Sequence, residues 1–149
     1  MTPVNGELPY DEGLLIGYRW YLATERTPAF PFGHGLGYTT WAYEDITVDG
    51  DSIGVTVRNS GSRPGREVVQ LYASRPDSAV ERPPRWLVGC AAVEAAAGET
   101  VNVVITVGDH NFRHWDSSAH AWMTEPGTYQ LHAGRSVADI LLNGVISRY

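Results

Sequence analysis

The sequence contains no lysine and only one cysteine among its 149 residues. Since all of its basic residues are arginine, a phosphate-binding P-loop, which needs a lysine, is excluded. Cys90 alone cannot form an intrachain disulfide or an all-cysteine metal site. Its neighbours in the string WLVGCAAV are apolar, and they predict a buried structural thiol rather than a reactive one.

Long hydrophobic runs are also missing. The longest weakly polar stretch, from Trp86 to Gly98, is interrupted by Glu94 and does not approach the roughly 18 apolar residues of a membrane helix. The N-terminal residues do not show the basic and then apolar regions of a signal peptide. We therefore expect a soluble chain with no transmembrane segment and no membrane partner, while its compartment stays open.

The charge balance is acidic, with 17 acidic against 11 basic residues and a formal net charge of -6. The arginines cluster between residues 63 and 85, but Glu67, Asp77 and Glu81 lie among them, which is typical of a solvated loop face. A net-negative surface without a concentrated basic patch repels phosphate backbones, so no nucleic-acid partner is expected.

From Trp41 onward, short runs rich in Val, Ile, Thr and aromatic residues alternate with turn residues, which is typical of an all-β sandwich. In IGVTVRN, the residues Ile53, Val55 and Val57 fall on one face, as expected for an antiparallel sheet with one buried side. The pattern predicts seven or eight antiparallel strands in an immunoglobulin-like sandwich. The eight candidate strands are 41–48, 52–59, 66–74, 86–94, 99–107, 119–124, 127–134 and 138–146.

No helix of ordinary length is predicted, although Asp109 is suited to cap a single turn through Asn111. The first forty residues mix aromatic residues with Gly and Pro and show no sustained helical or strand period. They are interpreted as an extended connecting arm.

Metal, cofactor and catalytic sites are not expected. His110 and His114 have the i, i+4 spacing of a helical metal site, but the segment between them is predicted to change from turn to strand. The GHGLG string at residues 33–37 lacks the preceding strand, following helix and lysine of a nucleotide loop. Acidic residues sit at strand ends, turns and rims, and no pair of them is placed in a cleft.

Two strings in the arm, YDEGLLIGYRWY (residues 10–21) and FPFGHGLGYTT (residues 30–40), resemble the junction between the second and third domains of family 3 glycoside hydrolases. The string VTVRNSGSRPGREVVQLYAS (residues 55–74) is similar to a strand, turn and strand of that family's fibronectin type III-like module, and the likeness extends to the end of the chain. The resemblance implies that residues 1–40 are a junction arm from a preceding α/β domain. Residues 41–149 are then a fibronectin type III-like β-sandwich.

Members of this family are retaining β-glycosidases with an Asp nucleophile on a barrel and, typically, a Glu acid/base on an α/β sandwich domain. This chain shows no match to the nucleophile motif, and the family's substrate-binding Lys-His pair cannot exist without lysine. The resemblance therefore implies a non-catalytic accessory module. Its expected role is to pack against and stabilise the catalytic barrel and α/β domains of a β-glucosidase-like enzyme, with a possible homo-oligomer contact.

The arm is expected to make the contacts between domains and to lack partners, or to be partly disordered, when the chain stands alone. The alternative function is a free-standing carbohydrate- or polymer-binding module. Most of the tryptophans are predicted to pack in the core or at an interface; Trp86 and Trp115 are the candidates for sugar stacking. The expected inter-domain contact residues are Tyr10, Glu12, Tyr18, Arg19, Phe30, Phe32, His34, Leu36 and Tyr38.

Overall fold

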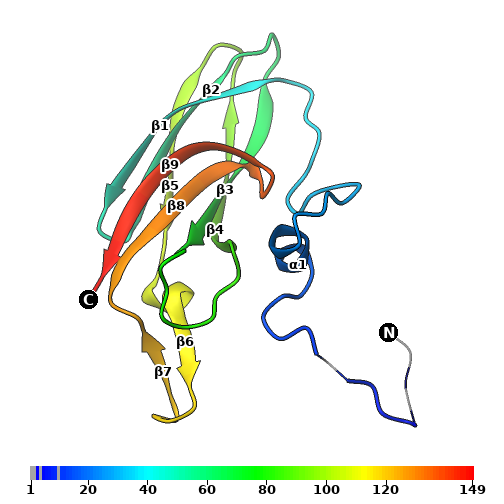
Figure 1. Ribbon diagram of the computed structural model, residues 1–149. Coiled ribbons are helices and arrows are strands. Elements are labelled where there is room, and N and C mark those ends of the chain that lie inside the picture. The colour runs from blue at the N-terminus through cyan, green and yellow to red at the C-terminus, as the bar shows by residue number, and fades with distance from the viewer. Residues whose placement is uncertain (1–2, 4, 10) are drawn as a thin grey trace.

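The computed structural model describes residues 3, 5–9 and 11–149. Its main body is a pair of antiparallel sheets packed face to face, with an arm along one side (Figure 1). The first sheet has the strand order β1 (Trp41–Asp49), β2 (Ser52–Asn59), β5 (Thr100–Thr106). The second sheet has the order β4 (Trp86–Ala95), β3 (Gly65–Ser74), β8 (Gly127–Ser136), β9 (Asp139–Arg148). The predicted all-β sandwich is confirmed.

The core lies between the two larger sheets and is built mainly from alternate residues of β2, β3, β5 and β8. Ile53, Val55 and Val57 of β2 are fully buried, which confirms the face predicted from their spacing. From the second sheet, Leu71 and Leu131 face them and are also fully buried. Burial of each such side chain contributes about 1.5–3 kcal/mol, so this alternation supplies most of the driving force for the sandwich.

Cys90 is exposed, and the prediction of a buried thiol is wrong. Leu71 pairs with Gly89 but Tyr72 pairs with Leu87, so Val88 is an extra residue that forms a β-bulge in β4. A bulge reverses which side chains face the core in the residues that follow it. The residues around Cys90 are therefore apolar in sequence, but the Cys90 thiol itself faces outward.

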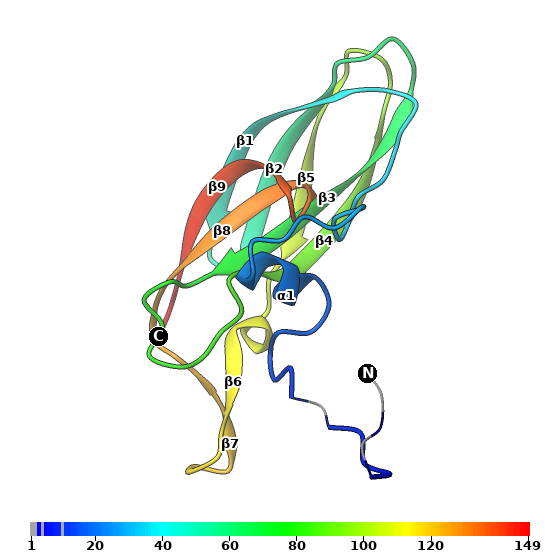
Figure 2. The same ribbon diagram turned by 45° about the vertical axis from the view of Figure 1, so that its right-hand side comes forward.

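A two-stranded hairpin projects from the end of the sandwich (Figures 1 and 2). The predicted helical turn is confirmed as the 3-10 helix η1 (Asp109–Phe112), but the prediction that Asp109 caps it is wrong, because the N-cap is Gly108 and Asp109 is the first residue of the helix. The hairpin consists of β6 (Arg113–Asp116) and β7 (Ala121–Thr124). β6 was not predicted, and the strand expected at 119–124 begins at Ala121, because residues 117–120 form the turn between these strands.

The arm includes one short helix, α1 (Tyr18–Ala23), so it is not extended throughout. None of the α1 residues is buried, and no apolar period marks the helix in the sequence. The position of α1 depends on contacts with the sandwich, and such contacts cannot be predicted from the periodicity of the sequence. No helix in the described part of the chain is long and apolar enough to cross a membrane.

Candidate docking surface and the cleft beside it

The arm packs on the outer face of the sheet that contains β3 and β4 (Figure 2). The Tyr18 ring stacks on Phe32 with 4.4 Å between centroids and meets Tyr72 of β3 edge-on at 6.5 Å. The Tyr18 hydroxyl accepts a hydrogen bond of 2.9 Å from the backbone N–H of Leu87. Tyr18, expected to lack a partner in the isolated chain, therefore has partners within it.

Gly33 brings the arm backbone directly over Gln70 of β3. The Gln70 Nε2 atom donates to the carbonyl oxygens of Gly33 at 2.9 Å and Arg135 at 2.5 Å, and the Tyr72 hydroxyl donates to Gln70 Oε1 at 2.6 Å. Gly33 has φ +83°, and a Cβ atom there would overlap the Gln70 amide. Only glycine combines this conformation with so close an approach, so this position fixes the path of the arm.

Burial of the outer face of β3 shows how closely the arm covers it. Tyr72 has no exposed surface and Gln70 keeps only 7%, although both point away from the sandwich core. Burial raises the pKa of Tyr72 well above its ordinary value, so its hydroxyl stays protonated and continues to donate to Gln70. The arm and the sandwich therefore share a second, smaller buried layer.

Asn59, at the end of β2, holds the last residues of the arm against the sandwich by hydrogen bonds. Its Oδ1 accepts hydrogen bonds from the Thr39 hydroxyl at 2.6 Å and from the Gly61 N–H at 3.1 Å. Its Nδ2 donates to the carbonyl oxygens of Arg63 at 2.7 Å and Ala95 at 3.1 Å. The amide is fully buried and uses both of its oxygen lone pairs and both of its protons.

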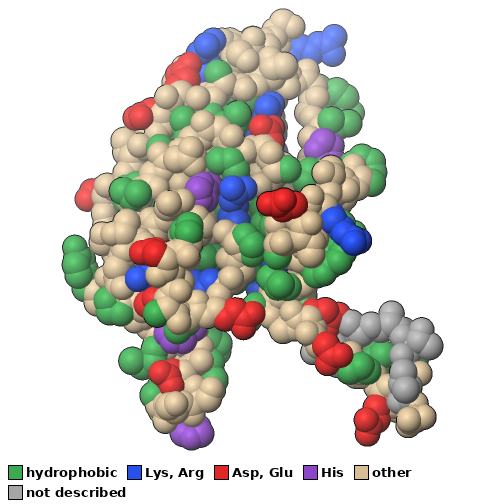
Figure 3. Space-filling view, viewed as in Figure 1, with side chains coloured by type: hydrophobic (Ala, Val, Ile, Leu, Met, Phe, Trp, Pro, Cys, Tyr) green, Lys and Arg blue, Asp and Glu red, His purple; other side chains and the backbone are tan. Residues whose placement is uncertain are grey.

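Several large apolar side chains of the arm are uncovered, and hydrophobic side chains appear among charged ones on this side of the molecule in Figure 3. The exposed fractions are 58% for Ile16, 76% for Phe30, 92% for Leu36 and 94% for Tyr38. A single exposed apolar residue needs no explanation, but several on one segment indicate a contact surface. We call Ile16, Phe30, Leu36 and Tyr38 the arm patch.

The predicted contact residues separate into two groups. Tyr18 and Phe32 contact the chain's own sheet or each other, whereas Phe30, Leu36 and Tyr38 point outward, with His34 stacked on Phe30 at 5.8 Å. Whether any of them contacts another domain stays a prediction. Three further predicted residues are Glu12 and Arg19, which are half-buried, and Tyr10, which lies outside the described residues.

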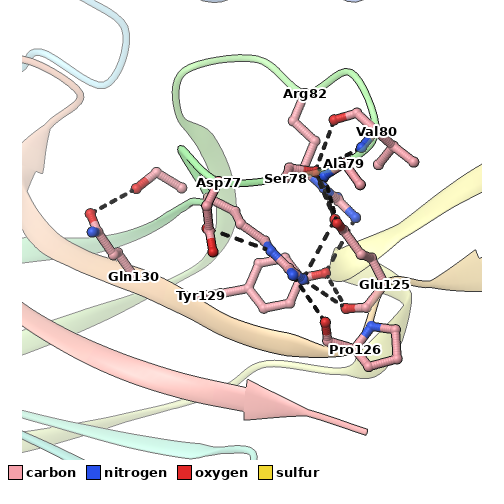
Figure 4. A network of polar contacts seen from close by, with 11 residues as sticks. Asp77, Ser78, Ala79, Val80, Arg82, Glu125, Pro126, Tyr129 and Gln130 are labelled. Carbon is pink, nitrogen blue, oxygen red and sulfur yellow. Dashed lines mark hydrogen bonds and ion pairs between the residues drawn. The ribbon is translucent and has the colours of Figure 1, made fainter.

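The loop at residues 75–85 is held by Glu125, the residue just after β7 (Figure 4). The Glu125 carboxylate accepts hydrogen bonds of 2.7 Å from the Ser78 hydroxyl and from the Ala79 N–H. It also lies 3.5 Å from both Arg75 Nη1 and Arg82 Nε. The carboxylate therefore joins this loop to the hairpin.

Burial acts to raise the pKa of Glu125, but the opposing interactions are stronger. The hydrogen bonds from Ser78 and Ala79 and the positive charges of Arg75 and Arg82 stabilise the ionised form, so the net effect lowers the pKa. Glu125 is therefore a charged structural anchor. It is not a candidate for a proton donor at neutral pH.

A cleft of about 710 Å³ lies between the hairpin, the Glu125-anchored loop and the start of the arm. Trp115 of β6 and Trp122 of β7 are directly paired across the hairpin, with ring centroids 5.7 Å apart and an interplanar angle of 73°. Their exposed fractions are 52% and 63%. Volumes of about 300–1,000 Å³ are typical of small-molecule sites.

The two tryptophans predicted for sugar stacking differ in position. Trp86 is 7% exposed, and its Nε1 donates to the carbonyl oxygen of Asn111 at 2.9 Å, so it is a core residue at the back of the cleft. Trp115 is exposed, as that prediction requires. Trp122 was missed because its pairing with Trp115 depends on the unpredicted strand β6.

The histidines do not form a metal site in the described part of the chain, where no group of three or more suitable ligands comes together. A separate chain of polar contacts links Ser74, His132 and Asn143, with 2.8 Å from Ser74 Oγ to His132 Nε2 and 2.7 Å from His132 Nδ1 to Asn143 Oδ1. Burial lowers the pKa of His132. The Ser74 hydroxyl also lies 3.3 Å from Gln130 Oε1, so these side chains form a polar contact between the paired strands β3 and β8.

Comparisons with known proteins agree with this fold. Residues 67–137 match the family model described as a fibronectin type III-like domain. The chain is 44% identical over 144 residues to a probable beta-glucosidase K of Emericella nidulans, covering 95% of this chain and 17% of that protein.

Solved structures give the same result. DesR, a beta-glucosidase from Streptomyces venezuelae in complex with D-glucose, matches with a TM-score of 0.93 and 36% identity over 98% of this chain and 20% of its own. A GH3 beta-glucosidase from Bifidobacterium adolescentis matches with a TM-score of 0.86 and 30% identity over 93% of this chain and 21% of its own. Residues 67–137 are therefore a fibronectin type III-like domain, and nearly the whole chain is homologous to a segment, about a fifth of the length, of GH3 beta-glucosidases.

Proposed function

We propose that this chain is a non-catalytic accessory module of a beta-glucosidase of family GH3, and that it stabilises the arrangement of that enzyme's catalytic domains. The parent reaction is the hydrolysis of terminal β-linked glucosides with retention of configuration. The observation that carries the proposal is the arm patch: Leu36 and Tyr38 are more than nine-tenths exposed on an arm whose opposite side is anchored to the sandwich.

The anchoring supports a docking role because it makes the arm patch a preformed surface. Tyr18, Gly33 and Thr39 fix the arm to the sandwich at three separate places. A surface that is already ordered loses little conformational entropy when a partner domain covers it. Burial of Phe30, Leu36 and Tyr38 then contributes about 1.5–3 kcal/mol for each side chain that is covered.

A chimera tests this role. The chain replaces the homologous segment of the Streptomyces venezuelae beta-glucosidase, and Tm and hydrolysis of an aryl β-glucoside are measured for the chimera and for the 149-residue chain. We expect Leu36→Ser with Tyr38→Ser to lower the Tm of the chimera while leaving that of the chain unchanged. The matched control is Val104→Ser with Val145→Ser, which removes exposed apolar groups from the sandwich strands.

Two results would contradict the proposal. One is a chimera in which the arm double variant is as stable as the unmodified chimera. The other is turnover of the aryl β-glucoside by the purified 149-residue chain, because that activity requires a catalytic pair within it.

A further inference from the structure

We propose that the cleft between the hairpin and the arm is a binding subsite for a neutral saccharide, with Trp115 and Trp122 as the stacking platform. The use of β-linked glucosides as probes rests on the proposed function. The cleft itself is argued from its own residues, so the two proposals can fail separately.

The aromatic pair is held firmly enough to act as a platform. The β6–β7 ladder pairs Trp115 with Trp122 directly, and the Thr124 hydroxyl and Arg113 Nε bond the Asp109 carboxylate at 3.0 and 2.9 Å. Both tryptophans nevertheless keep more than half of their surface exposed. Exposed aromatic rings held on a rigid hairpin offer a large apolar contact at little cost in conformational entropy.

Most charged groups that line the cleft are already paired. Arg82 binds Glu125, Arg113 binds Asp109, and the Asp116 carboxylate accepts hydrogen bonds from the N–H groups of its own turn at 2.8 and 2.9 Å. Arg82 and Arg113 are thus balanced by acidic partners, whereas Asp116 keeps its negative charge and has its oxygen satisfied by backbone N–H groups. An anionic ligand would therefore find no unbalanced positive charge among these three groups.

Two charged side chains of the cleft stay available within the described part of the chain. Arg19 from α1 and Glu81 from the loop line the same cleft. No hydrogen bond or ion pair joins either side chain to another described residue, although the Arg19 guanidinium lies 6.0 Å from the centroid of the Tyr18 ring. They have opposite charges, so together they add donors and acceptors but no net charge. A ligand that suits them is uncharged and carries hydroxyl groups along its edge.

A pyranose meets both requirements, because its ring presents a C–H face to an aromatic ring and hydroxyl groups to planar polar side chains. The volume of about 710 Å³ is within the usual range for small-molecule sites. Leu36 and Tyr38 of the arm patch do not line this cleft, so the cleft and the arm patch are separate surfaces. The combination of exposed aromatic rings with polar side chains in one cleft favours a saccharide over a segment of a neighbouring domain.

The test is calorimetric titration of the 149-residue chain with cellobiose and with laminaribiose, together with tryptophan fluorescence. We expect saturable binding that Trp122→Ala weakens by at least about tenfold, equivalent to about 1.4 kcal/mol. Glu81→Gln, on the opposite wall and away from the hairpin, is expected to weaken binding several-fold without changing Tm. The matched control is Tyr38→Ala, which removes an exposed aromatic ring outside the cleft.

Three results would overturn the proposal. The first is no saturable binding of either disaccharide, and the second is an equal loss of binding in the Tyr38→Ala control. The third combines two measurements: Trp122→Ala lowers the Tm of the chimera as much as the Leu36 and Tyr38 double variant does, and the 149-residue chain binds neither disaccharide. This result would mean that a neighbouring domain, and not a saccharide, occupies the cleft. Each leaves the accessory role to be judged by the arm-patch variants.

Discussion

The carbonyl oxygen of Gly33 accepts a hydrogen bond of 2.9 Å from Nε2 of Gln70, across 37 residues of sequence. This bond joins the arm to the centre of the second sheet, because β3 lies between β4 and β8. It also places the arm backbone so near β3 that a side chain at residue 33 has no room. The orientation of the arm patch depends on this contact.

Gly33→Ala is expected to lower the free energy of unfolding by about 2 kcal/mol or more. The alanine must adopt a left-handed conformation, which costs about 1–2 kcal/mol, and its Cβ displaces the buried Gln70 amide. Chemical denaturation measures the loss, and limited proteolysis of the arm shows whether it detaches. Gly35→Ala is the control, because Gly35 has no positive φ and a Cβ added there would meet no atom within 4 Å; an equal loss in both variants would contradict the argument.

Asn59→Asp is expected to destabilise the chain by about 3 kcal/mol at pH 7. The change replaces two donated protons with a second acceptor oxygen that faces the carbonyls of Arg63 and Ala95 in a fully buried site. Stability should partly return at low pH, where the protonated acid can donate one hydrogen bond. Asn102→Asp on the exposed face of β5 is the control, and a comparable loss there would argue against a special role for Asn59.

Glu125→Gln is expected to lower stability at neutral pH by about 3 kcal/mol, because Arg75 and Arg82 then lose their buried counter-charge. The folded state lowers the pKa of Glu125 below its ordinary value of 4.5. Its contribution is therefore complete above about pH 4.5 and is lost as the pH falls through the lower, folded-state pKa. The difference between wild type and variant should shrink over that range.

Unfolding curves at a series of pH values measure this effect. Glu44→Gln is the matched control, since Glu44 and Arg58 form an exposed pair at 2.6 Å. Exposed pairs contribute about 0–1 kcal/mol, so its curve should stay close to that of the wild type. A difference for Glu125→Gln that does not change with pH would show that the carboxylate charge is not what holds the loop.

Cys90 is expected to react with a thiol reagent in the folded chain without denaturant, because it faces outward from β4. Cys90→Ser should leave Tm unchanged, since no buried volume is lost. Absorbance during labelling with an aromatic disulfide measures the reaction. Reaction only after unfolding, or a large loss of Tm in Cys90→Ser, would restore the prediction of a buried thiol.

The sandwich was predictable because its signals are local. The alternation of Ile53, Val55 and Val57 reports directly which face is buried, and turn residues mark where strands end. The same local rule failed at Cys90, since the bulge at Val88 depends on how β4 pairs with β3. The local rule also failed at β6, because this strand has only four residues and pairs with β7 only once the hairpin has folded.

The sequence by itself determined the all-β class, the strand positions of both sheets and the likeness to one segment of GH3 glycoside hydrolases. Tertiary structure alone decided which arm residues face inward, because Tyr18 and Gly33 are placed by partners 69 and 37 residues away. It also decided which tryptophans are exposed, since Trp86 packs in the core while Trp115 and Trp122 meet across a hairpin. Strand periodicity is a property of neighbouring residues, whereas docking of the arm and opening of the cleft arise from contacts between distant ones.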